Sequence, residues 1–553
     1  MKFKRISRIL MILGMFLALT AALGASTANW STPENLSDWR LSANEPWLLR
    51  SDDGTQVVFW MQTDTFLKQE SLWARVRPPS GDWSTAQNIF SWIDYSNFFP
   101  ELGIAPDGTV WALWAMPDKA QTGDNMQVKS ASWSGSEPWQ IEVLSDYETD
   151  IRNIDLSIGP DNHLAATWVA CASSVADDQG PCDVRLRRRN PGASAWELRD
   201  ESVDATISGI LYGRSLVGPG GMIVTTWAES SQSTAGQWHV MANTFDPNTK
   251  TWDSPPKDIS AGEVRSNVWP FLSEPVMGAD GTVIVAWYQQ EAADFNKADL
   301  YSTTRQASTG NWNLPVLLSN VHTASVIIPP KLAVGQNGTA VAAWEQKKSI
   351  SVMEYAIFAN VRDPGGTWSS NPVQVSVWSD GIDLALPQVW PDGSSMLVWE
   401  VVDNSRDSTE DESVFWSVRP PNDAWGGLGM GQLGNWFNDI DGLSLAAADD
   451  GSITVVWGIN DFSRPINQRG EALVANWIPG PGTISIETLT SGYKSVNVNR
   501  AGVAVSRDGQ TKAAAWLTSK DVSQMTDPNK GVFYSQVNSA RAIYLPLVRQ
   551  KGD

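Results

Sequence analysis

The stretch Asp53-Gly54-Thr55-Gln56-Val57-Val58-Phe59-Trp60 joins a two-residue turn to an apolar run that ends in tryptophan. Seven further runs follow an Asp-Gly, Asn-Gly or related turn at the same distance, and a ninth carries one extra residue; they close at Trp114, Trp168, Trp227, Trp287, Trp344, Trp399, Trp457 and, for the ninth, Trp516. Successive closing tryptophans stand 54 to 60 residues apart. Such a period indicates an array of one structural unit rather than a set of unrelated domains.

Each repeat contains four short segments that we interpret as strands. A short apolar segment, such as residues 331–335, leads to the Asp-Gly turn, which is a strong hairpin signal. The tryptophan run comes next, followed by an alternating segment such as residues 72–77, a Gly- or Pro-rich turn and a fourth segment such as residues 373–377. Four antiparallel strands per repeat predict a blade of a β-propeller. Because the tryptophan run is apolar on both faces, it needs a neighbour on each side, as in blades stacked around an axis.

The two ends of the chain predict circular closure. Residues 29–36 match the fourth segment of a repeat, whereas the last repeat ends with the third segment at 532–537 and lacks a fourth. We therefore predict an all-β protein with a single β-propeller of nine four-stranded blades, closed by the N-terminal strand; eight blades are the alternative. The predicted boundaries are 1–28 for a signal peptide, 29–540 for nine repeats of about 57 residues, and 541–553 for a short C-terminal tail.

The N-terminal segment indicates export. Four basic residues within the first eight precede an apolar stretch at 9–23 and a group of small residues, the pattern of a secretory signal peptide. No later stretch has the length of a membrane span. The two cysteines, Cys171 and Cys182, then predict a disulfide. We expect a secreted protein, extracellular or at the cell surface, without a transmembrane segment after signal cleavage; an uncleaved N-terminal anchor is the alternative.

The net charge limits the partners. It is −21, and −25 without the four cations of the signal segment. A surface this acidic repels phosphate backbones, so no nucleic-acid partner is expected. Acidic loops at 403–412 and 521–527 offer oxygen ligands for Ca²⁺, although neither has EF-hand spacing, and solvated loops are the alternative. Two thiols and three histidines argue against zinc, and no other cofactor is predicted.

A ligand site is expected on one face of the ring. The loops between second and third segments are long and divergent, and they share this face with the connections between repeats. Aromatic groups centred on Trp92, Trp269 and Trp436 enter it through those connections. Such rings stack on sugars, so a glycan site is one interpretation; filling the gaps between blades is the other.

The pattern Trp-x-x-Pro, apolar strand, Asp-Gly and apolar run ending in Trp resembles the sialidase-like, BNR-type repeat propellers of secreted bacterial proteins. The Asp-box of true sialidases, Ser-x-Asp-x-Gly-x-Thr-Trp, is not met, and residues 51–55 come nearest to it. Sialidase chemistry would need an arginine cluster, a tyrosine nucleophile with a glutamate base, and an aspartic acid. Arg152, Arg265 and Arg500, each before a first segment, are the candidates for the cluster; ordinary surface arginines are the alternative.

The resulting prediction is an exported, monomeric, non-catalytic propeller that binds a carbohydrate or an extracellular protein on its divergent loop face. No catalytic residue is assigned. One alternative is a glycoside-acting enzyme of the sialidase-like type, and another is a structural module of an extracellular assembly.

Overall fold

The computed structural model describes residues 30–37, 42–64, 67, 69–93, 100–117, 125–135, 138–172, 181–198, 201–230, 238–260, 270–291, 294–319, 330–349, 351–404, 412–427, 429–437, 439–465, 468–478, 483–490, 498–519 and 530–538. The predicted signal peptide and C-terminal tail lie outside these ranges.

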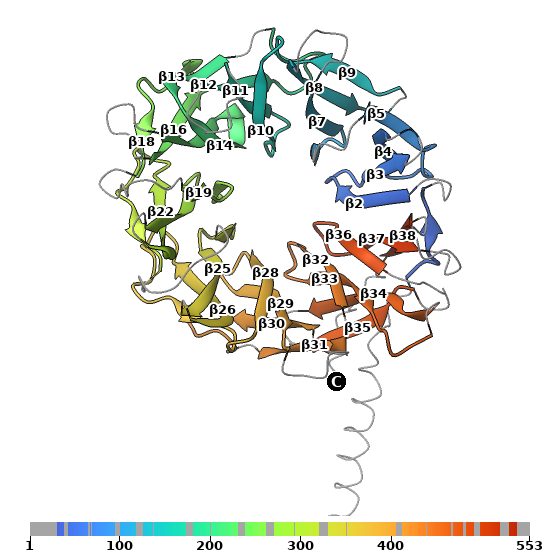
Figure 1. The fold of residues 1–553 in the computed structure, drawn as a ribbon. Helices are drawn as coiled ribbons and strands as arrows, with labels where there is room; N and C mark the ends of the chain where they lie inside the picture. The colour runs from blue at the N-terminus through green and yellow to red at the C-terminus, as the bar shows by residue number, and fades with distance from the viewer. Residues whose placement is uncertain are drawn as a thin grey trace, which may run out of the picture.

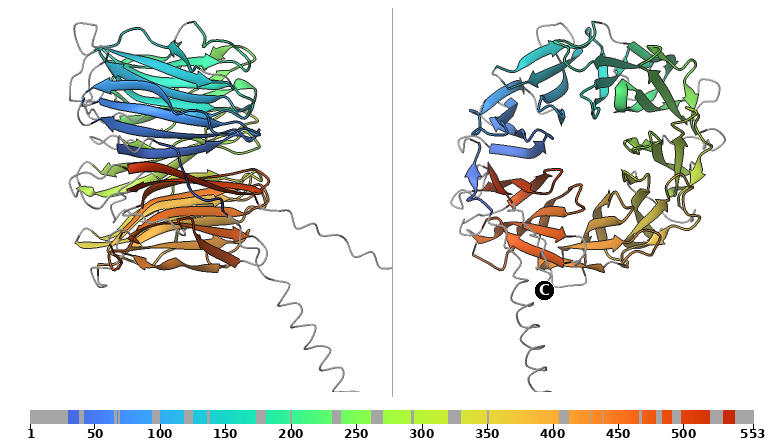
Figure 2. Two further views of the ribbon diagram at one scale, coloured as in Figure 1. Left: turned by 90° about the vertical axis from the view of Figure 1, so that its right-hand side faces the viewer. Right: turned by 180° about the vertical axis from the view of Figure 1, so that it is seen from behind.

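Nine antiparallel sheets surround a common axis and form a nine-bladed β-propeller, as predicted (Figures 1 and 2). Blade 1 contains β2 (Ser42–Arg50), β3 (Gln56–Asp64), β4 (Gln69–Arg77) and β5 (Gln87–Ile93). Blade 2 contains β6 (Glu101–Ile104), β7 (Val110–Pro117), β8 (Met126–Trp133) and β9 (Gln140–Val143). Blade 3 contains β10 (Asp150–Ile158), β11 (Leu164–Cys171), β12 (Cys182–Arg189) and β13 (Glu201–Ser208). Blade 4 contains β14 (Ile210–Val217), β15 (Ile223–Ser230), β16 (Trp238–Asp246), β17 (Thr251–Trp252) and β18 (Lys257–Asp258). Blade 5 contains β19 (Phe271–Leu272), β20 (Val276–Met277), β21 (Val283–Glu291), β22 (Asp294–Arg305) and β23 (Val316–Leu317).

Blade 6 contains β24 (Lys331–Val334), β25 (Ala340–Ser349), β26 (Val352–Arg362) and β27 (Val373–Gln374). Blade 7 contains β28 (Gly381–Val389), β29 (Ser395–Val402), β30 (Glu412–Arg419) and β31 (Gly429–Phe437). Blade 8 contains β32 (Asp439–Ala447), β33 (Ile453–Asn460), β34 (Gly470–Ile478) and β35 (Thr483–Thr488). Blade 9 contains β36 (Val498–Val505), β37 (Thr511–Ser519), β38 (Lys530–Asn538) and β1 (Glu34–Asn35). A short 3-10 helix (Pro219–Gly221) replaces the Asp-Gly turn of blade 4.

The N-terminal strand closes the ring as the fourth strand of blade 9. Glu34 pairs with Tyr534, and the amide of Leu36 donates to the carbonyl oxygen of Val532 at 2.8 Å. The blue start of the propeller therefore lies beside its red end in Figure 1. Leu36 itself is fully buried. Closure thus combines backbone pairing with an apolar anchor.

The closing tryptophans form the cores between blades. All nine are no more than 2 % exposed. Among the described residues the hydrophobic clusters also number nine, and each contains side chains of two neighbouring blades. Burial on both faces of the second strand follows directly from this stacking. A blade therefore completes its core only when both of its neighbours are in place.

The Asp-Gly turns fix both their own hairpin and the adjacent blade. Within a turn the first side chain caps the chain, as where the amide of Thr339 donates to Oδ1 of Asn337 at 3.0 Å. The second residue is left-handed, with φ of 89° at Gly393. A Cβ at Gly393 would lie 2.6 Å from Nδ2 of Asn337 in the preceding blade. Glycine is thus required for its conformation and for close contact between successive turns.

The first strands of six blades are longer than the sequence predicts. They continue past a register shift, which lies between Arg152 and Asp155 in β10 and between Leu211 and Arg214 in β14. Equivalent irregularities occur in β2, β28, β32 and β36. Asn153 and Tyr212 adopt left-handed φ values of 46° and 57° inside these bulges. A bulge bends a strand and re-aims the side chains that follow it.

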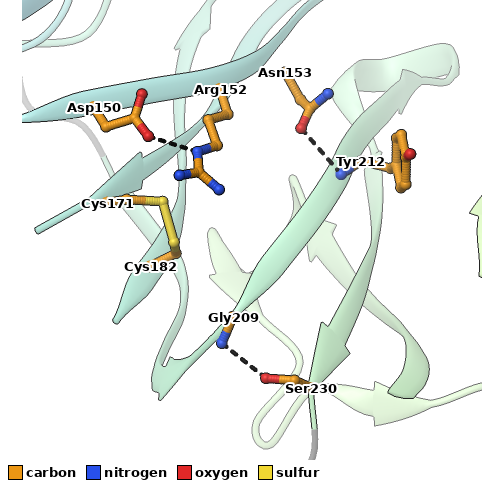
Figure 3. Close-up of a disulfide and its surroundings, with 8 residues drawn as sticks. All are labelled: Asp150, Arg152, Asn153, Cys171, Cys182, Gly209, Tyr212 and Ser230. Atoms are coloured by element: carbon orange, nitrogen blue, oxygen red, sulfur yellow. Dashed lines mark hydrogen bonds and ion pairs between the residues drawn. A yellow bond between two sulfur atoms is a disulfide. The ribbon is translucent and has the colours of Figure 1, made fainter. Parts of the chain in front are cut away.

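The predicted disulfide is present. Cys171 and Cys182 are opposite one another in β11 and β12 and are joined, 11 residues apart in sequence (Figure 3). The bridge joins the end of β11 covalently to the start of β12. The bond is compatible with an oxidising compartment.

Gly393→Ala should lower the stability of the fold by about 2 kcal/mol more than Gly365→Ala. Both glycines have positive φ, but a Cβ at Gly365 would have no neighbour within 4 Å. The difference therefore isolates contact between blades from backbone strain. Urea midpoints of the two variants measure it, and equal losses would contradict the proposed turn-to-turn contact.

Candidate functional site

Five consecutive blades carry a charged residue at the same position of the inner strand. Glu101, Asp155, Arg214, Glu274 and Lys331 each stand thirteen residues before the closing tryptophan of their repeat. We call this set the charged column. Asp155 and Arg214 are the first paired residues after the bulges of β10 and β14. Glu274 lies in the interruption between β19 and β20, while Glu101 and Lys331 begin β6 and β24.

The column residues of blades 2, 3 and 4 meet at one point. Nη1 of Arg214 lies 3.3 Å from Oδ1 of Asp155 and 3.7 Å from Oε1 of Glu101. The other oxygen of Asp155 accepts a 2.8 Å hydrogen bond from the amide of Ser215. A side chain of blade 4 reaches blade 2 only where the inner strands converge. The cluster therefore lies between the inner strands of blades 2, 3 and 4.

The two carboxyl groups of this cluster share an environment that disfavours their charge. Burial raises the pKa of Glu101 to about 7, and the carboxylates of Asp155 and Glu274 add to the effect. Burial also raises the pKa of Asp155 to about 6, although Arg214 and the Ser215 amide favour its ionised form. Burial lowers the pKa of Arg214, but the carboxylates outweigh it and the net shift is upward. Both carboxyls thus exchange protons near neutral pH.

A cavity adjoins the cluster on the side of blades 5 and 6. Its volume is about 250 Å³. Arg214, Glu274 and Lys331 line it together with residues of the inner strands, among them Ser273 and Pro275. Glu274 and Lys331 are both exposed. The column therefore offers a ligand two exposed charges next to a half-buried arginine.

Aromatic side chains lie just beyond the column. Tyr212, two residues before Arg214, has its ring centroid 5.2 Å from that of Phe271. Phe271 in turn stacks on Tyr288, with centroids 4.7 Å apart. Burial raises the pKa of Tyr288 to about 12, so its phenol stays protonated. These three residues, which we call the aromatic wall, flank the charged column in blades 4 and 5.

The predicted arginines do not form a cluster with one another among the described residues. Arg152 lies inside β10, not before it, and its Nε donates to Oδ2 of Asp150 at 2.6 Å (Figure 3). Arg500 lies inside β36, where it is 52 % exposed and pairs with Glu45 across the closure of the ring. Arg265 lies outside the described residues. A ligand-binding role for the three arginines stays a prediction.

The predicted tryptophans occupy different surroundings. Trp92 is 6 % exposed and packs in the core between blades 1 and 2, a position that suits the gap-filling interpretation. Trp436 is half-buried, with its ring 5.8 Å from that of Phe415. Trp269 lies outside the described residues. Their role in sugar binding is still a prediction.

The calcium prediction also rests on loops that are largely outside the described residues, which exclude 405–411 and 520–529. Within the described part of the chain, no group of three or more His, Cys, Asp or Glu side chains is placed to hold a metal ion. No helix there is long and apolar enough to cross a membrane.

Sequence reasoning missed the charged column, although a signal for it exists. Glu101, Asp155 and Lys331 open three of the first segments, but their spacing is seen only when every repeat is aligned on its closing tryptophan. Arg214 and Glu274 then fall into the same register. The charges differ in sign, so no single motif marks them.

Comparisons with known proteins find similarity among solved structures alone. No family model and no curated protein matches it. Similar solved structures include an ulvan lyase (10 % identity, 91 % of this chain and 95 % of that one, TM-score 0.40), the NanB sialidase of Streptococcus pneumoniae (9 %, 93 % and 93 %, 0.32) and an α-L-arabinanase of Penicillium chrysogenum (13 %, 60 % and 93 %, 0.32). Likeness at this level assigns neither a family nor an activity, and the resemblance to BNR-type repeats remains one of architecture.

Glu101→Gln should change how stability depends on pH. The folded state raises the pKa of this carboxyl from 4.5 to about 7, so wild-type stability falls as the pH rises through that interval. Glutamine does not ionise. The variant should therefore be more stable than wild type at about pH 8.5. We expect a gain of about 1 kcal/mol, less than the pKa shift alone implies, because solvent screens a side chain that is 39 % exposed.

At about pH 4 the difference in unfolding free energy between Glu101→Gln and wild type should be close to zero, since both side chains are then neutral. Urea unfolding at the two pH values provides the measurement. A variant that is less stable than wild type at the higher pH would show that pairing with Arg214 dominates instead.

Proposed function

We propose that this chain is a glycan-binding propeller whose ligand is held in the central channel by the charged column and the aromatic wall. The observation that carries the proposal is the convergence of Glu101, Asp155 and Arg214, from three successive blades, beside a cavity. Export to the outside of the cell, with the N-terminal segment as its signal, is part of the same proposal.

The chemistry of the channel suits a hydroxyl-rich ligand. Carboxylates accept hydrogen bonds from sugar hydroxyls, and Arg214 and Lys331 donate to ring and hydroxyl oxygens. Tyr212 and Phe271 are both partly exposed and add apolar ring surface beside the column. Few residue types besides these are needed to orient a glycan.

Stability alone is a poor explanation for the cluster. Burial of the carboxyls costs free energy, as their raised pKa values indicate, and a buried ion pair is seldom better than apolar packing. The left-handed residues Asn153 and Tyr212 add strain of about 1–3 kcal/mol each. Strained backbone and perturbed carboxyls gathered at one place favour a functional site.

The route to the column is compatible with the predicted ligand face. The first strand of each blade starts at the divergent loops and ends at the Asp-Gly turn, so a ligand entering from the loop face meets the aromatic wall and then the column. Most of those loops lie outside the described residues, and binding on the loop face itself stays a separate prediction. A protein ligand is the remaining alternative for that face.

Arg214→Gln should weaken binding of the best ligand from a glycan array by about tenfold or more, the equivalent of about 1.4 kcal/mol. The matched control is Arg464→Gln, because Arg464 also pairs with two carboxylates, Asp461 and Glu471, but lies in blade 8. Calorimetric titration of both variants measures the change. Unchanged affinity in Arg214→Gln would overturn the channel site.

Glycoside cleavage is a second candidate, favoured by one specific observation. A carboxyl whose pKa is about 7, such as that of Glu101, is suited to donate a proton to a leaving group at neutral pH. Asp155 lies close enough to share Arg214 with it. Wild-type protein that releases reducing ends from the bound glycan, with loss of turnover but retained binding in Glu101→Gln, would favour the enzyme over the binder.

A further inference from the structure

A second cavity lies on the opposite side of the molecule from the divergent loops, at the Asp-Gly turn face between blades 2 and 3. Its volume is about 330 Å³. Blade 2 contributes the turn at Asp107 and Thr109, and blade 3 contributes Asn162 and the loop from Asn190 to Ser194. We call this cavity the turn-face pocket.

Cross-strand pairing sets the walls of the turn-face pocket. Trp111 of β7 is opposite Ser132 of β8, and Ser132 is opposite Gln140 of β9, so these three side chains form one row. On blade 3 the facing pair is Leu164 and Arg189. All five line the pocket. The walls therefore consist of side chains on regularly paired strands of blades 2 and 3.

Neighbouring protein groups bind the guanidinium of Arg189 in the pocket. Nη1 of Arg189 donates to Oε1 of Glu142 at 2.8 Å, and Nη2 donates to the carbonyl oxygen of Ala193 at 2.7 Å. Its guanidinium also lies 4.6 Å from the ring centre of Trp111. An arginine engaged in this way does not require an anionic ligand. The lining also contains Asp107, whose Oδ1 accepts a hydrogen bond from the amide of Thr109 at 2.9 Å, and several neutral hydroxyl and amide groups.

Several of those neutral groups have hydrogen-bonding capacity to spare. Ser132 is 7 % exposed, yet within the described part of the chain no protein group bonds to its hydroxyl. The same holds, among the described residues, for the hydroxyl of Thr109 and the side-chain amide of Asn190. None of these three groups is among the fully buried side-chain atoms without a partner in the described part of the chain, so they face the open pocket, where a polar occupant can bond to them. Asn190, Gln140 and Ser194 are exposed or partly exposed at the rim, which leaves the pocket open to solvent.

We propose that the turn-face pocket is a second binding site, for a neutral, hydroxyl-rich ligand of the mono- or disaccharide class. The unpaired hydroxyls and amide match sugar hydroxyls in both donor and acceptor roles. Arg189 is already paired and Asp107 adds a negative charge, so the lining disfavours phosphate, sulfate and carboxylate groups. The site is independent of the channel, because it lies on the turn face and shares no residue with the charged column.

The test is saturation-transfer NMR on the purified protein with glucose, galactose, mannose, xylose and their common disaccharides at millimolar concentration. Ser132→Leu should narrow the pocket, remove the hydroxyl and reduce the signal about tenfold. Asn190→Ala removes one rim amide at an exposed position, so it should weaken binding without affecting the fold. Gln306→Ala is the matched control, because Gln306 follows the third strand of blade 5 as Asn190 follows that of blade 3.

Binding that is lost in Ser132→Leu, reduced in Asn190→Ala and retained in Gln306→Ala supports the pocket. Three results would overturn it: no signal from any of these sugars, a signal that survives both pocket variants, or a signal lost only in Arg214→Gln, which would place the sugar in the channel. If Ser132→Leu does not fold, Asn190→Ala decides alone. Since the pocket variants leave the column intact, their outcome is separate from that of the channel proposal.

Discussion

Packing of tryptophan-bearing strands between neighbouring blades is the interaction on which this structure depends. Each closing tryptophan is buried in a cluster that two blades share, so no blade has a complete core alone. Such an array is stable only if its ends also meet. The N-terminal strand satisfies this requirement in blade 9, and ion pairs of Arg500 with Glu45 and of Arg507 with Asp52 join blades 9 and 1.

A closed ring gives the inner strands fixed positions, and the candidate site follows from that rigidity. Arg214 meets carboxyls from two other blades because stacking sets their separation. The bulges in β10 and β14 lie directly before Asp155 and Arg214 and so affect the direction of both side chains. Burial at the convergence point, more than any single neighbour, moves the carboxyl pKa values toward neutrality.

Most of the fold can be predicted from the sequence, but little of the candidate site can. The tryptophan period, the Asp-Gly turns and the unmatched end segments predict nine blades and their closure, because each is a local pattern repeated many times. The bulges cannot be predicted from the sequence, because the surrounding sheet, and not the local residue pattern, holds Asn153 and Tyr212 in left-handed conformations. Contacts such as Arg500 with Glu45 join residues from opposite ends of the chain, and nothing local marks them. Trp92 illustrates a further limit. The sequence alone does not distinguish a buried aromatic side chain in a connection between blades from an exposed one.

Covalent trapping of the junction between the chain ends tests closure of the ring most directly. The hydroxyl oxygens of Ser31 and Ser535 lie 3.4 Å apart, on the N-terminal segment and on β38. In the double variant Ser31→Cys with Ser535→Cys, mass spectrometry of the folded, oxidised protein should find these two cysteines joined to each other. Two free thiols in a folded protein would mean that the first residues of the propeller do not complete its last blade.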